Sequence, residues 1–121
     1  GLGGVMEAAC RGAWEAGGIT VGILPGSDRS AANPWLTVAI PTGLGHARNA
    51  LVALSGDAIV AVTGACGTLS EIALGLKMGK PVVGLRTWEL PRSRTGELPV
   101  VMADSAAQAV ELAERLAGGG L

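Results

Sequence analysis

Apolar residues follow two different patterns along this chain, and the two patterns alternate. Helical spacing, with apolar residues three or four positions apart, covers 4–16, 45–55, 68–78 and 105–117. Short, continuous apolar runs bounded by Gly, Pro or polar residues cover 19–24, 36–40, 58–62, 81–85 and 100–102. The pattern therefore predicts strands that alternate with helices, joined by polar loops at 27–34 and 86–99.

The apolar runs are continuous, not alternating, which is typical of strands buried on both faces of a parallel sheet. Alternating strands and helices then predict an α/β fold, a Rossmann-like three-layer sandwich with a mostly parallel sheet. No internal repeat, linker or long low-complexity segment divides the chain. We therefore expect residues 1–121 to form a single nucleotide-binding domain.

Composition narrows the classes of partner. The 121 residues carry a net charge of −1, so nothing in the sequence indicates nucleic-acid binding. The longest apolar runs are too short to span a bilayer, and no basic amphipathic stretch indicates membrane binding. Cys10 and Cys66 lack the spacing of a zinc site or disulfide framework. We expect a cytoplasmic protein with no metal and no resident cofactor.

Small residues gather in loops that follow the predicted strands, where ligands bind in folds of this class. The clearest case is the run 62–71, in which a strand opens through a Gly-rich loop into a helix and presents backbone N–H groups to an anion. The predicted binding residues for a nucleotide or phosphorylated small molecule are Gly3, Gly4, Gly26, Gly43, Gly45, Asn49, Gly64, Ala65, Cys66, Gly67 and Thr68.

Two charged residues, Arg48 and Glu71, are the candidate catalytic groups. Arg48 stands in the first turn of a predicted helix, where the positive end of the dipole disfavours a cation unless an anion is near. Glu71 has two interpretations. Thr68 and Glu71 have the spacing of a capping box, with Thr68 as the N-cap, but Glu71 can also act on a bound ligand. Asn49 similarly can bond a ligand hydroxyl or the local backbone.

Five segments of the chain resemble the Lonely Guy superfamily, whose members long carried a lysine decarboxylase label. These segments are Gly3-Gly4-Val5-Met6-Glu7-Ala8-Ala9, Gly17-Gly18, Gly22-Ile23-Leu24-Pro25-Gly26, Ala47-Arg48-Asn49 and Gly64-Ala65-Cys66-Gly67-Thr68-Leu69-Ser70-Glu71. The likeness spans residues 1 to about 85 and is greatest to an uncharacterised bacterial branch. The best-known enzymes of the superfamily release a free base and ribose 5-phosphate from a nucleoside 5′-monophosphate. A relative with the same fold binds and carries molybdenum cofactor without hydrolysing it.

The resemblance implies that Arg48 and Glu71 are catalytic and that Gly64, Gly67 and Thr68 hold a phosphate. The chain departs from the enzymes' pattern where Asn49 replaces a Lys and where Thr63-Gly64-Ala65 replaces Pro-Gly-Gly. The resemblance nonetheless leads us to expect a nucleoside 5′-monophosphate phosphoribohydrolase, in which Glu71 stabilises an oxocarbenium-like transition state. The alternative is a non-catalytic carrier or sensor of a nucleotide or of a cofactor of the molybdenum cofactor type.

Two further expectations concern completeness and assembly. The resemblance implies an additional strand–helix–strand ahead of Gly1, so the chain is expected to lack this unit. The helices are rich in Ala, Leu and Trp and carry few charges, which leaves apolar faces that a small monomer covers poorly. We expect a homodimer or a higher homo-oligomer.

Overall fold

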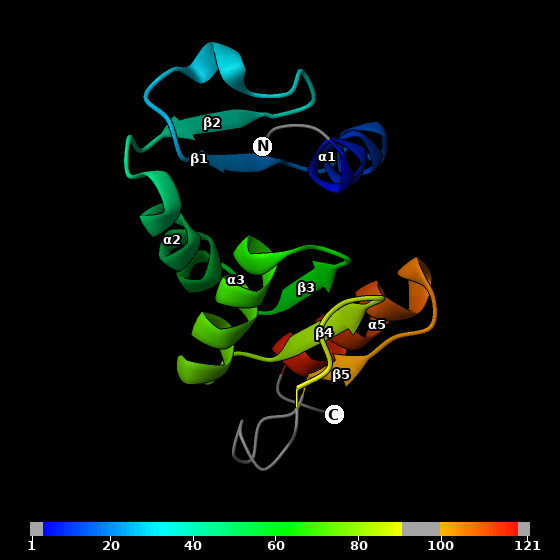
Figure 1. Ribbon diagram of the computed structural model, residues 1–121. Helices are drawn as coiled ribbons and strands as arrows, with labels where there is room; N and C mark the ends of the chain where they lie inside the picture. Colours follow the sequence, from blue (N-terminus) through cyan, green and yellow to red (C-terminus); the bar gives the residue numbers. More distant parts are fainter. Residues whose placement is uncertain (1–3, 91–99, 119–121) are drawn as a thin grey trace. The chain divides into compact units, whose positions relative to one another are not determined.

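The computed structural model describes residues 4–90 and 100–118 of the chain. The chain divides into two compact units, residues 1–48 and residues 49–121. Figure 1 labels their helices and strands. Each unit is a separate arrangement of parallel strands and helices, and each is described by itself.

Unit 1 contains one long helix, two strands and two short 3₁₀ turns. These elements are α1 (Val5–Glu15), β1 (Val21–Leu24), η1 (Arg29–Ala31), β2 (Val38–Pro41) and η2 (Gly45–Ala47). β1 and β2 pair in parallel, with Val21 opposite Val38 and Leu24 opposite Pro41. The carboxyl ends of β1 and β2 therefore lie side by side at one edge of this sheet.

A buried threonine fixes the start of this ladder. Thr20 donates its hydroxyl to the Trp35 carbonyl at 2.6 Å, and the Thr37 backbone N–H donates to the Thr20 hydroxyl at 2.8 Å. The Arg11 guanidinium of α1 lies 5.3 Å from the ring centroid of Trp35, which is the distance of a cation–π contact. These contacts set the register of β1 and β2 and link α1 to the segment before β2.

Unit 2 contains the longer part of the chain. Its elements are α2 (Arg48–Ser55), β3 (Ile59–Val62), α3 (Cys66–Lys77), β4 (Val82–Leu85), β5 (Val101–Met102) and α5 (Ala106–Ala117). Arg48, the first residue of α2, is counted with unit 1. The strands lie in the order β3-β4-β5, and both pairs are parallel. Val62 stands opposite Leu85, so β3 and β4 end at the same level.

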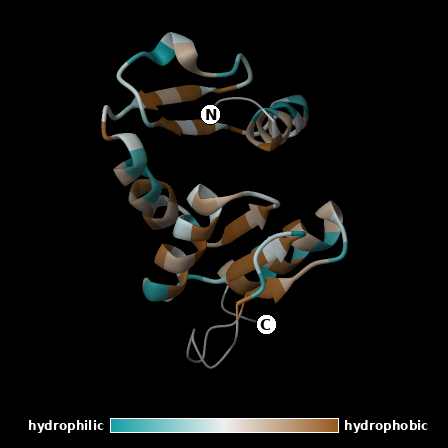
Figure 2. Cartoon of the chain, viewed as in Figure 1, coloured by the Kyte–Doolittle hydropathy of each residue, from teal (hydrophilic) through white to brown (hydrophobic). Residues whose placement is uncertain are grey.

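The core of unit 2 has two faces, because successive residues of a strand point to opposite sides. Val82 packs with Ile72 of α3 on one face, and Val83 packs with Ala109 of α5 on the other. Helices α3 and α5 therefore cover opposite faces of the sheet (Figure 1), and the strands between them are largely hydrophobic (Figure 2). This part of the fold is the predicted three-layer sandwich.

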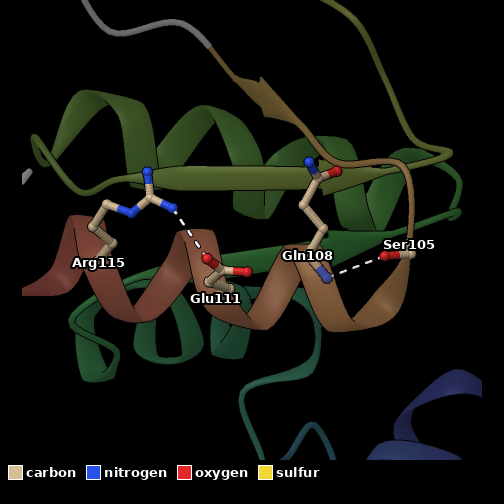
Figure 3. Close-up of polar contacts among 4 residues, drawn as sticks. All are labelled: Ser105, Gln108, Glu111 and Arg115. Carbon is tan, nitrogen blue, oxygen red and sulfur yellow. Dashed lines mark hydrogen bonds and ion pairs between the residues drawn. The ribbon is translucent and has the colours of Figure 1, made fainter.

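Helix α5 begins with a side-chain cap. Ser105 is the N-cap, and its hydroxyl accepts from the Gln108 backbone N–H at 3.1 Å (Figure 3). The Gln108 side-chain oxygen in turn accepts from the Asp104 backbone N–H at 2.6 Å. One turn further along, Glu111 and Arg115 form an exposed ion pair at 3.3 Å. The Ser105 cap satisfies one of the backbone donors that the first turn of a helix otherwise leaves unpaired.

The α/β class and the parallel pairing are confirmed, but several predicted boundaries are wrong. Helix α3 starts at Cys66, not at residue 68, and the helix predicted over 45–55 opens with the 3₁₀ turn η2. Burial on both faces describes β4, but Val21 of β1 is 53% exposed and Ile40 of β2 is 45% exposed. In the described residues β1 and β2 form a two-stranded sheet. Both are therefore edge strands, and neither has a neighbouring strand on each side, as a central strand does. The single-domain organisation stays a prediction.

Candidate functional site

The loop that joins β3 to α3 has an unusual backbone. Thr63 has a φ of 48° and Gly64 a φ of 101°, so two successive residues lie in the left-handed half of φ space. A Cβ on Gly64 would lie 2.1 Å from the Thr68 Oγ1 and 2.4 Å from the Thr68 Cβ. Only glycine fits this position, because the loop folds back closely onto the first turn of α3.

The first backbone N–H groups of α3 have no acceptor among the described residues. The N-cap is Ala65, which has no side chain that can bond the first turn. Among the described residues, no protein acceptor bonds the backbone N–H groups of 64–68, whereas the Leu69 N–H donates to the Ala65 carbonyl at 3.1 Å. A run of open N–H groups at a helix N-terminus is suited to an anion such as phosphate.

The prediction that Thr68 is the N-cap of a capping box with Glu71 is wrong, because Ala65 is the N-cap of α3. Thr68 is the third residue of α3, two positions past its first residue Cys66, so it does not cap the helix. The sequence fits a capping box because the spacing is right, but the tight turn at Gly64 starts the helix earlier. Glu71 lies half-buried in the second turn of α3, beyond the N–H groups.

Two residues that the sequence did not single out hold this loop in place. The Thr87 hydroxyl donates to the Thr63 carbonyl at 2.5 Å, and the Trp88 Nε1–H donates to the Ala65 carbonyl at 3.1 Å. Both residues follow β4, which lies beside β3 in the sheet. The pairing of β4 with β3 brings Thr87 and Trp88 next to the loop after β3, but the order of strands in the sheet was not predicted from the sequence.

Asn49, a predicted ligand-binding residue, is buried in the first turn of α2. Its side-chain N–H donates to the Ser70 hydroxyl of α3 at 3.4 Å. The partner is therefore a side chain of the neighbouring helix, which neither interpretation of Asn49 anticipated. This contact links α2 to α3.

Two of the predicted loop glycines of unit 1, Gly43 and Gly45, donate their backbone N–H groups to protein carbonyls. The Gly43 N–H donates to the Gly26 carbonyl and the Gly45 N–H to the Pro25 carbonyl, both at 2.9 Å. Gly4 is the N-cap of α1 with a φ of 68°, and Gly3 lies outside the described residues. Gly43 and Gly45 thus close turns at the ends of β1 and β2, and their N–H groups are not available to an anion.

Arg48 has a partner within unit 1. Its Nη1 donates to the Ile23 carbonyl of β1 at 2.9 Å. The negative end of this carbonyl dipole partly balances the positive charge of Arg48, for which the sequence showed no partner. Arg48 therefore lies near the carboxyl end of β1. Glu71 belongs to unit 2. The convergence of Arg48 and Glu71 on one pocket stays a prediction.

Residues 4–90 and 100–118 show neither a cluster of metal-ligating side chains nor a membrane-spanning helix. This part of the chain contains no group of three His, Cys, Asp or Glu side chains placed to hold a metal ion. Cys10 and Cys66 are free thiols, and Cys66 is exposed at the start of α3. Within the same residues, no helix has the length and apolar character needed to cross a bilayer.

Comparison with known proteins places the chain in a family. The model of the SLOG cluster4 family matches residues 1–116. The chain belongs to the SLOG cluster4 family. An uncharacterized protein of Archaeoglobus fulgidus is 46% identical over 100 residues, which cover 75% of this chain and 66% of that protein. The chain spans just under two thirds of the length of this relative.

Solved structures of molybdenum cofactor proteins are similar to the chain. The molybdenum cofactor binding protein of Rippkaea orientalis is 40% identical with a TM-score of 0.83, over 92% of this chain and 70% of that one. The molybdenum cofactor carrier protein of Chlamydomonas reinhardtii is also 40% identical, with a TM-score of 0.81, over 95% and 72%. The Rossmann-like fold is thereby confirmed. The finer assignment to the lysine decarboxylase-labelled enzymes, and with it a hydrolase activity, finds no support in these relatives.

Proposed function

We propose that this SLOG cluster4 protein binds and carries a phosphorylated heterocyclic cofactor of the molybdenum cofactor type, without chemical change. Such a cofactor is a cargo, a pterin with a terminal phosphate. The observation that carries the proposal is the row of N–H groups at 64–68, which no acceptor in residues 4–90 and 100–118 bonds and which suits a phosphate. The likeness at 40% identity to two molybdenum cofactor proteins supports the pterin as the remainder of the ligand.

The test is retention of the cofactor. Purified protein is incubated under anaerobic conditions with molybdopterin released from a denatured molybdoenzyme, passed through a desalting column and assayed for the fluorescence of oxidised pterin. We expect pterin to elute with the protein. Gly64→Ala should abolish retention, because the new Cβ displaces the turn that aims the N–H groups. Gly12→Ala, on α1 with nothing within 4 Å of the added Cβ, is the matched control and should retain pterin.

A second candidate function is phosphoribohydrolase activity, and one observation favours it. Glu71 lies half-buried in the second turn of α3, beyond the N–H groups of 64–68, so a carboxylate stands next to the proposed phosphate site. The test is incubation with AMP and chromatography for free adenine. The carrier proposal expects no adenine. Release of adenine that Glu71→Gln abolishes would replace the carrier proposal with the hydrolase.

A further inference from the structure

We draw no further inference here: the strongest candidate, the apolar face that Val21, Val38 and Ile40 expose on the β1–β2 sheet of unit 1, carries nothing because no contact in residues 4–90 and 100–118 shows what covers it.

Discussion

Gly64→Ala tests the geometry on which the site depends. Gly64 has a φ of 101°, and the new Cβ would lie 2.1 Å from the Thr68 Oγ1 and 2.4 Å from its Cβ. Rotation of the Thr68 side chain relieves the first contact but not the second, since the Cβ is fixed by the helix backbone. The substitution therefore meets both backbone strain and steric overlap.

The two costs can be sized separately. A non-glycine residue held in a sparsely populated backbone region costs about 1–3 kcal/mol. An added methyl group with no space costs about 1–3 kcal/mol more. We expect Gly64→Ala to lower the free energy of unfolding by roughly 2–6 kcal/mol, a large part of the 5–15 kcal/mol typical of a domain.

The assay is urea denaturation followed by circular dichroism, and Gly67→Ala is the matched control. A Cβ on Gly67 has nothing within 4 Å, and the residue is already helical in α3. Alanine is favoured over glycine in a helix by up to about 1 kcal/mol, so this variant should be neutral or slightly more stable. Equal stability of the two variants would refute the described turn at Gly64.

Three further substitutions test local contacts. Ser105→Ala removes the N-cap of α5 and should lower the free energy of unfolding by about 1 kcal/mol, measured by urea denaturation. Lys80→Met removes an ammonium group that donates to the Leu54 carbonyl at 2.7 Å near the end of α2, and should cost about 1 kcal/mol in the same assay. The hydrogen bonds from the Ser30 side chain and backbone lower the pKa of Asp28, so their stabilisation is complete above the ordinary pKa of 3.8 and is lost as the pH falls through the lowered value. NMR titration should show that Ser30→Ala moves the pKa of Asp28 upward.

Helices and strands could be told apart in the sequence because each has its own pattern of apolar residues. Helix α5 shows this most clearly: its apolar residues recur at helical spacing, and Ser105 stands where the pattern begins. Boundaries were less predictable where glycines decide them. Thr68 has the sequence of an N-cap, yet the left-handed turn at Gly64 lets α3 begin at Cys66. A pattern of residue types does not reveal which glycine has the positive φ.

The site was predictable only where a single strand and its loop define it. The loop at 63–68 was found because strand, loop and helix are contiguous in the sequence. Thr87 and Trp88 were missed because their contacts depend on β4 lying beside β3, which is information about the sheet. The Ser70 partner of Asn49, 21 residues further along the chain, was likewise not predictable from the sequence, and a ligand contact of Asn49 stays a prediction.

The glycine-rich loops of the two units look alike in sequence but differ in what their N–H groups do. In unit 1 the N–H groups of Gly43 and Gly45 are bonded to protein carbonyls, and a bound anion would have to break those bonds. Beside Gly64 the Thr63 and Ala65 carbonyls accept from Thr87 and Trp88, whereas the N–H groups of 64–68 have no acceptor in the part of the chain that the structure describes. Because a trans peptide points its C=O and N–H in opposite directions, anchoring the carbonyls also aims the donors. Glycine content alone therefore does not make a phosphate loop, and the hydrogen bonds of the neighbouring carbonyls decide which loop can act as one.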